Sequence, residues 1–320
     1  MLTTAMRLAR CAVRHCTSAT RAVLGALLML LPLGVTRAQG AIECGACAEW
    51  NMPQRPFRLH GDTYWVGTHG LGAILITSPQ GHVLIDGGLP QSAPLIRAAV
   101  ESLGFHLGDV KLILNSHAHY DHAGGIAELQ RASGARVMAS PWSADVMRSG
   151  KSQPGDPQLG IAFGYAPVAN VGTFTFEDTL RVGPIAIVPH ATLGHTPGGT
   201  TWTWRACDGT RCLDFVYADS ETPVSTDDFL FTKNTTYPNV IADFERGYAT
   251  LARLSCDVLV TPHPGVSALW DRVSPSDGTI GPGFVDREAC RRYAASARRA
   301  LESRVAKERA DDAMNPARFE

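Results

Sequence analysis

The densest cluster of potential metal ligands in the chain is His117-Ala-His119-Tyr-Asp121-His122. Four imidazole or carboxylate side chains fall within six residues, and these residue types together are typical of zinc sites. The cluster follows the apolar run Val110–Asn115 and precedes a helical pattern. We therefore expect the four side chains to gather at a turn between a buried strand and a helix.

Two further histidines follow predicted strands in the second half of the chain. His195 lies in Gly-His-Thr-Pro-Gly-Gly after residues 185–189, and His263 lies in Thr-Pro-His-Pro-Gly after residues 258–261. Open α/β sheets place their sites in loops of this kind. Six ligands exceed what one tetrahedral zinc uses, so the sequence predicts two zinc ions with three protein ligands and one open position each. Such a pair supplies a hydroxide nucleophile at neutral pH.

Alternating strand and helix patterns predict that residues 39–320 form one layered α/β domain, with a core at about 50–305. Residues 39–58 are expected to be an irregular arm, and residues 141–167 a loop-rich stretch. The predicted strands are 63–66, 73–77, 82–85, 110–115, 135–139, 171–176, 185–189, 200–205, 214–217 and 258–261. The predicted helices are 92–103, 125–133, 240–254 and 285–310.

Residues 1–38 have the pattern of a secretory signal peptide. A basic segment with no acidic residue is followed by the apolar run 22–35 and by the small-residue site Thr36-Arg-Ala38. The alternative is an uncleaved membrane anchor, but the run is short for a spanning helix. The 320 residues are 45% hydrophobic and 18% charged, with a net charge of −1. This composition predicts a globular protein and gives no indication of nucleic-acid binding.

The His-x-His-x-Asp-His motif, with Gly-His195 and His263, resembles the metallo-β-lactamase superfamily. Three longer segments resemble its subclass B3: Gly194–Trp204, Tyr217-Ala-Asp-Ser220 and Thr261-Pro-His-Pro-Gly265. The resemblance covers nearly the whole chain after residue 50. It implies a four-layer αβ/βα sandwich with a dinuclear zinc site at one edge of the sheets.

The same resemblance implies a role for each site residue. The first zinc would be held by His117, His119 and His195, and the second by Asp121, His122 and His263. Asp121 would also orient the nucleophile, and Ser220 and Thr222 would contact the substrate carboxylate. Asp86, in Ile-Asp-Gly-Gly, would orient the metal ligands without binding a metal ion itself. An aspartate before two glycines is also common in turns.

The implied activity is zinc-dependent hydrolysis of the β-lactam amide bond in penicillins, cephalosporins and carbapenems by a metal-bound hydroxide, which confers antibiotic resistance. The expected product is a periplasmic monomer with a small-molecule substrate and no stable membrane association after signal cleavage. An alternative is another dinuclear zinc hydrolase, namely a lactonase, a glyoxalase II-like thioesterase or a phosphodiesterase. In such relatives an aspartate at the position of Asp219 commonly bridges the metals. A non-enzymatic exported zinc-binding protein is a third possibility.

Six cysteines follow the predicted signal peptide, and in an oxidising compartment they predict three disulfides. Cys207 and Cys212 flank a predicted Asp-Gly hairpin turn, which brings them within disulfide range. Cys44 and Cys47 are expected to pair locally, although a redox Cys-x-x-Cys or half a zinc knuckle has the same spacing. The B3 resemblance implies the third pair, Cys256 with Cys290.

Two further features concern the surroundings of the site. Some B3 enzymes place a tyrosine shortly after the two hydroxyl residues, whereas residues 223–231 contain none. Phe231, Thr232 or a water would have to take the place of that tyrosine.

The arginine-rich last helix is predicted to be a solvated face rather than a binding patch.

Overall fold

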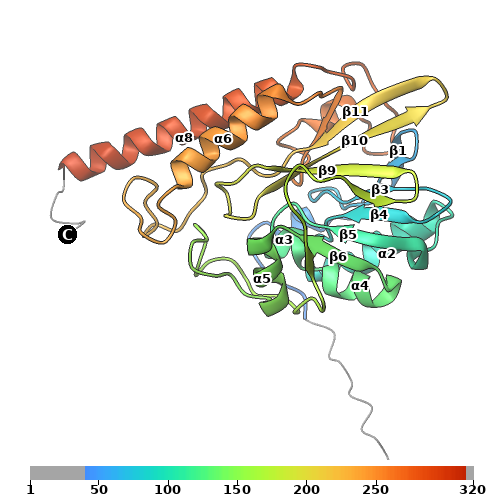
Figure 1. Ribbon diagram of the computed structural model, residues 1–320, viewed down its shortest axis with the longest axis horizontal. Coiled ribbons are helices and arrows are strands. Elements are labelled where there is room, and N and C mark those ends of the chain that lie inside the picture. The colour runs from blue at the N-terminus through green and yellow to red at the C-terminus, as the bar shows by residue number, and fades with distance from the viewer. Residues whose placement is uncertain (1–39, 315–320) are drawn as a thin grey trace, which may run out of the picture. The chain divides into compact units, whose positions relative to one another are not determined.

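The computed structural model describes residues 40–314, which form two β-sheets with helices on their outer faces (Figure 1). The predicted signal peptide, residues 1–38, lies outside the described residues. Within residues 40–314, no helix has the length and apolar character needed to span a membrane.

The first sheet has the strand order β1-β2-β3-β4-β5-β6-β7. Neighbours from β1 to β4 are antiparallel, and those from β4 to β7 are parallel. In β4, Leu84 faces one apolar cluster while Val83 and Ile85 face the other, so both faces of the strand are covered. This explains its continuous apolar run. The strands are β1 (Phe57–His60), β2 (Thr63–Trp65), β3 (Ile74–Ile76), β4 (His82–Ile85), β5 (Val110–Leu114), β6 (Arg136–Ala139) and β7 (Gly172–Thr173).

The second sheet has the strand order β12-β11-β10-β9-β8, in which only β11 and β12 are parallel. Trp202 and Trp204 alternate along β10, and both pack in the apolar core between the two sheets. Trp202 is fully buried, which fits a role in the core. The strands are β8 (Leu180–Val182), β9 (Ile185–Ala191), β10 (Thr200–Asp208), β11 (Arg211–Tyr217) and β12 (Val258–Val260).

Helices complete the outer layers. On the first sheet lie α2 (Ala93–Ser102), α4 (Ile126–Ser133) and α5 (Pro141–Ser149), and on the second lie α6 (Val240–Arg253) and α8 (Ala289–Met314) (Figure 1). Short helices are α1 (Cys47–Trp50), α3 (Tyr120–Ala123) and α7 (Leu269–Arg272). The layers are therefore helix, sheet, sheet and helix, which confirms the predicted αβ/βα sandwich.

The structure corrects the prediction for residues 141–167, because this stretch begins with helix α5. The side chain of Ser140 accepts a hydrogen bond from Ser143 N, Pro141 is the first helical residue, and Gly150 ends the helix with a φ of 69°. These are ordinary start and stop signals of a helix. The predicted irregular arm at residues 39–58 likewise contains α1 and the first residues of β1.

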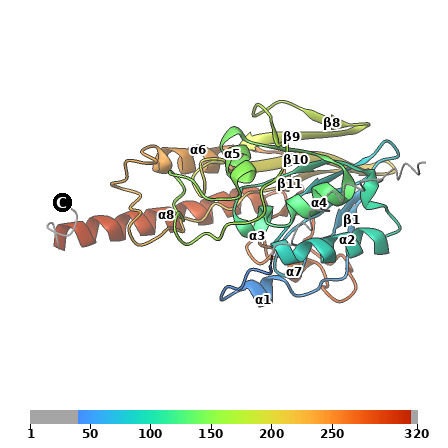
Figure 2. The ribbon, with the colours of Figure 1, turned by 90° about the horizontal axis from the view of Figure 1, so that it is seen from below.

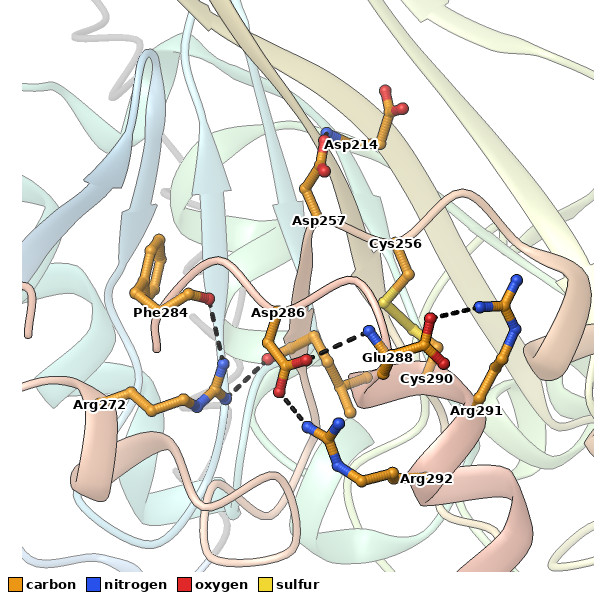
Figure 3. Close-up of a disulfide and its surroundings, with 11 residues drawn as sticks. Asp214, Cys256, Asp257, Arg272, Phe284, Asp286, Glu288, Cys290, Arg291 and Arg292 are labelled. Carbon is orange, nitrogen blue, oxygen red and sulfur yellow. Dashed lines mark hydrogen bonds and ion pairs between the residues drawn. A yellow bond between two sulfur atoms is a disulfide. The ribbon is translucent and has the colours of Figure 1, made fainter. Parts of the chain in front are cut away.

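Three disulfides occur within residues 40–314: Cys44–Cys47, Cys207–Cys212 and Cys256–Cys290. Cys207 and Cys212 are directly paired residues of β10 and β11. The Cys256–Cys290 bond joins the segment just before β12 to the first turn of α8 (Figure 3). It therefore ties the longest helix to the second sheet.

Candidate metal centre

The loop after β5 is fastened to the second sheet before it delivers its metal-binding side chains. The carbonyl of Asn115 accepts a hydrogen bond from Trp202 Nε1 at 3.1 Å, and the carbonyl of Ser116 accepts one from Thr200 N at 2.8 Å. His117 and His119 follow at once, and both are buried. The two sheets thus fix the position of these imidazoles from opposite sides.

Three histidines from two distant loops meet beside this point. The ligand atoms of His117, His119 and His195 lie within 4.8 Å of one another. His195 comes from the loop after β9, where its neighbour Gly194 has a φ of 136° and a Cβ there would meet the ring of Phe244 at 2.4 Å. A glycine is therefore required next to His195.

Each of the three rings is held through its outer nitrogen. His117 Nδ1 lies 2.7 Å from Asp219 Oδ1, and His119 Nε2 lies 3.1 Å from Asp156 Oδ1. His195 Nδ1 donates to the carbonyl of Thr222 at 2.8 Å. The ring nitrogens left to face a metal ion are then Nε2 of His117, Nδ1 of His119 and Nε2 of His195. Partners of this kind set the ring orientation in metal sites.

A second group shares His117 with the first. The ligand atoms of His117, Asp121 and His122 also lie within 4.8 Å of one another. Asp121 Oδ2 is 3.2 Å from His122 Nε2 and 3.3 Å from His263 Nε2. The side chain of His263 is 26% exposed, so this side of the group is open to solvent. All six sequence-predicted ligands are therefore brought together.

Burial largely sets the protonation of the first group. Burial, helped by the neighbouring histidines, holds the pKa of His117 well below its usual value and lowers that of His195 to about 3. For His119, burial acts in the same direction, but the charge and hydrogen bond of Asp156 outweigh it and raise the pKa. Two of the three rings are thus neutral at pH 7, which is the form that binds metal ions.

The second group behaves as a buried ion pair. Burial favours the neutral form of Asp121, but the charge of His122 outweighs it, and the pKa of Asp121 lies well below its usual value. In the same way, Asp121 overcomes the effect of burial and raises the pKa of His122. A divalent cation would supply the positive charge that this carboxylate needs.

The donor set fits a metal ion such as zinc. His117 Nε2 is buried without a hydrogen-bond partner among the described residues, and an unpaired buried polar atom is costly. Imidazole nitrogens and one carboxylate are the ligands that zinc takes in catalytic sites. We therefore regard both groups as residues able to bind metal.

The carboxylate of Asp86 lies against the first residues of the loop after β5. It accepts hydrogen bonds from Asn115 Nδ2, Ser116 N, Ser116 Oγ and Tyr217 OH at 2.7–3.1 Å. Asp86 is fully buried, and burial raises its pKa to about 6. It thus joins the loop after β5 to Tyr217 of the second sheet and fixes the base of the ligand loop.

Two residues near the site were not singled out from the sequence. Asp156, which holds His119, and Gln158, whose Nε2 lies 3.3 Å from His195 Nε2, come from the irregular stretch after α5. No motif at residues 156–158 marks either residue, because the pairing depends on how this stretch packs against the ligand loop. Asp219, considered above as a metal bridge, instead holds His117 and belongs to neither ligand group.

Replacing Asp156 by alanine is expected to weaken zinc binding by about 10- to 100-fold, the usual effect of losing a partner that orients a ligand. The reason is that His119 Nε2 loses its acceptor and the ring is free to turn. Competition with a zinc-chelating dye measures the affinity. Asp145→Ala, at an exposed position on α5, is the matched control. An unchanged zinc affinity in Asp156→Ala would contradict this role.

Comparison with known proteins agrees with this geometry. A sequence model described as the metallo-beta-lactamase superfamily matches residues 73–268. The chain is similar to the solved structure of Rm3 metallo-beta-lactamase, with 51% identity, 84% of this chain and 100% of that chain covered, and a TM-score of 0.79. It is also similar to MEM-A1, a subclass B3 enzyme from a soil metagenome library, with 47% identity, 82% and 99% coverage, and a TM-score of 0.78.

Curated relatives match a shorter part of the chain. A hydroxyacylglutathione hydrolase of Anaeromyxobacter dehalogenans is 32% identical over 122 residues, which cover 38% of this chain and 37% of the relative. One from Bradyrhizobium is 28% identical over 129 residues, 40% of this chain and 41% of the relative. The chain thus spans about two fifths of these relatives. The family match, the two ligand groups and the sandwich fold together show that the chain belongs to the metallo-β-lactamase superfamily, with subclass B3 enzymes among its structural neighbours.

Proposed function

We propose that the protein is a metallo-β-lactamase of the B3 type that uses two zinc ions to hydrolyse the amide bond of β-lactams. The observation that carries the proposal is the similarity to two metallo-β-lactamases over almost their whole length, at 51% and 47% identity. When bound, zinc lowers the pKa of water and polarises a carbonyl oxygen, which is the chemistry that amide hydrolysis requires.

In this proposal, His117, His119 and His195 hold one zinc, and Asp121, His122 and His263 hold the other. The Asp121 carboxylate also accepts a hydrogen bond from the attacking water and orients it toward the carbonyl carbon. Ser220 and Thr222 contact the substrate carboxylate. The backbone of Thr222 is already fixed to the site, because its carbonyl accepts the hydrogen bond from His195 Nδ1.

A thioesterase is the main alternative, because the curated relatives are named hydroxyacylglutathione hydrolases. Two observations favour the β-lactam substrate. The match to those relatives covers only about two fifths of their length. In addition, the alternative expects Asp219 to bridge the metals, whereas its Oδ1 lies 2.7 Å from His117 Nδ1, on the outer side of that ring.

We further propose that the protein is exported to the periplasm as a monomer and confers resistance to β-lactams. The leader pattern of residues 1–38 supports export. The three disulfides also support it, because such bonds persist in oxidising compartments.

The test is hydrolysis of a carbapenem by the purified protein, measured with and without a chelator. We expect hydrolysis that stops on chelation and returns when zinc is added. The thioester of glutathione with a hydroxy acid is assayed in parallel. A folded, zinc-loaded protein that cleaves the thioester and no β-lactam would reject the β-lactamase proposal in favour of the alternative.

A further inference from the structure

The loop that carries the proposed substrate hydroxyls lies along helix α8. We call residues 219–232 the site loop. In Figure 2, α8 extends beyond the sheets, and the orange segment that follows β11 lies beside its C-terminal half. The buried hydroxyl of Tyr293 makes the first contact between helix and loop, because it donates to the carbonyl of Asp219 at 2.8 Å and accepts from Glu221 N at 3.0 Å.

Glu308 makes a second set of contacts, just over four turns further along α8. Its carboxylate accepts hydrogen bonds from Phe231 N at 3.2 Å, Thr232 N at 3.0 Å and Thr232 Oγ1 at 3.0 Å. The side chain is only 5% exposed and pairs with Arg304 Nε at 2.7 Å. A buried carboxylate needs several partners of this kind, so the position of the loop is coupled to that of the helix.

Arg304 extends the same connection to earlier residues of the site loop. Its Nη2 lies 2.9 Å from Ser225 Oγ and 3.4 Å from the carbonyl of Phe229, and its guanidinium lies over the ring of Phe231. Together, Arg304 and Glu308 hold four positions of the site loop. We call these two residues the loop clamp.

The clamp lies on the buried face of α8. Tyr293, Ala297, Leu301, Arg304 and Glu308 recur every three or four residues, which places them on one side of a helix. The arginines on the other faces, such as Arg291, Arg292 and Arg299, are exposed. The prediction of a solvated, arginine-rich helix is therefore correct for most of its surface and wrong for Arg304.

The site loop also contacts the segment whose side chains touch two of the proposed ligands. Thr226 N donates to the carbonyl of Pro157 at 2.9 Å. Pro157 stands between Asp156, which holds His119, and Gln158, which contacts His195. The clamp is thus connected to both segments that border the proposed substrate site.

The clamp also accounts for the missing tyrosine. Phe231 is 3% exposed and packs in the cluster beneath α6 and α8, while Thr232 is hydrogen-bonded to Glu308. Both candidates for the place of that tyrosine are therefore held by contacts with the helices α6 and α8.

We propose that Arg304 and Glu308 are positioning residues that fix the site loop and so determine which β-lactams bind, according to the size of their ring substituents. This inference rests on the proposed β-lactamase function. In this proposal, large substituents contact the joined segments at 157 and 226, whereas small ones do not. Preorganising such a contact surface lowers the cost of ordering it on binding.

The kinetic test compares a β-lactam with a large ring substituent and one with a small substituent. In Glu308→Ala we expect KM for the large substrate to rise about tenfold, with kcat, zinc content and KM for the small substrate close to those of the unmodified protein. Glu308→Gln keeps one side-chain oxygen as an acceptor, so its KM for the large substrate should lie between those of Glu308→Ala and the unmodified protein. Glu302→Ala, at an exposed position of the same helix, is the control. Equal KM changes for both substrates would overturn the proposal.

A second readout does not depend on activity. Amide hydrogen exchange at Phe231 and Thr232 should accelerate at least about tenfold in Glu308→Ala, because these two amides lose a buried acceptor, and should stay unchanged in Glu302→Ala. If Glu308→Ala does not fold, Arg304→Lys removes the contacts to Ser225 and Phe229 while keeping the charge, and exchange near these two residues should still accelerate. Unchanged exchange in the folded variants refutes the clamp, whereas faster exchange in a protein that cleaves no β-lactam refutes only the β-lactamase assignment.

Discussion

Replacing Asp121 by asparagine is expected to lower kcat/KM for β-lactam hydrolysis by roughly 100- to 10,000-fold, the range for losing a group that orients and transfers a proton. Oδ2 of Asp121 lies within 3.3 Å of both His122 Nε2 and His263 Nε2. The substitution therefore removes the one carboxylate that the second ligand group offers. It also removes the charge that raises the pKa of His122, while the shape of the side chain is kept.

Steady-state kinetics and the zinc content per chain measure this effect. We expect about one zinc per chain in Asp121→Asn, against two in the unmodified protein, because a zinc site with three protein ligands loses one of them. The exposed Asp109→Asn is the control. Two tightly bound zinc ions and near-normal turnover in Asp121→Asn would show that this carboxylate is neither a ligand nor a catalytic group.

The second large effect is expected at Asp86, where alanine should lower the free energy of unfolding by about 3–5 kcal/mol. Four hydrogen bonds from Asn115, Ser116 and Tyr217 converge on this buried carboxylate. Its removal leaves the donors of Asn115 and Ser116 without an acceptor among the described residues, while Tyr217 OH keeps only the carbonyl of Gly72, at 3.3 Å. The backbone of Asp86 also has a φ of 63°, a conformation that alanine adopts less readily than aspartate or asparagine.

Urea unfolding in the presence of a chelator measures this loss without any contribution from bound metal. Asp86→Asn separates the two causes, because asparagine accepts the left-handed backbone but presents an amide donor to the surrounding donors. We expect it to lose less stability than Asp86→Ala. A loss below about 1 kcal/mol in Asp86→Ala would mean that the four hydrogen bonds together contribute no more than a single ordinary one.

The sequence was sufficient to predict the arrangement of the ligand loops. The runs before His117, His195 and His263 are apolar and rich in β-branched residues, and each forms a strand that ends just before its histidine. Since the strand ends meet at one edge of the sandwich, knowing the strands was enough to place the loops. The hairpin between Cys207 and Cys212 could be predicted for a similar reason, although its two loop residues are Gly209 and Thr210, since Asp208 pairs with Arg211.

Contacts that depend on packing could not be predicted in this way. Asp156 reaches His119 only because α5 and the stretch after it fold back over the ligand loop, and no local pattern encodes that return. Helix α5 has clear start signals in Ser140 and Pro141, but its short apolar stripe lies beside a polar, glycine-rich segment, and the whole stretch therefore resembles a loop in the sequence. In the sequence, Glu308 resembles any surface glutamate. Only the tertiary structure shows the backbone amides that donate hydrogen bonds to its carboxylate.

The six proposed ligands come from loops of both sheets: four follow β5, one follows β9 and one follows β12. An ion bound there closes one edge of the sandwich and acts as a cross-link between distant parts of the chain. A ligand that binds only the folded state adds about 2.7 kcal/mol at 100 times its Kd, so resistance to heat and proteolysis would follow the free zinc concentration. Zinc starvation would then reduce the amount of surviving enzyme as well as its turnover.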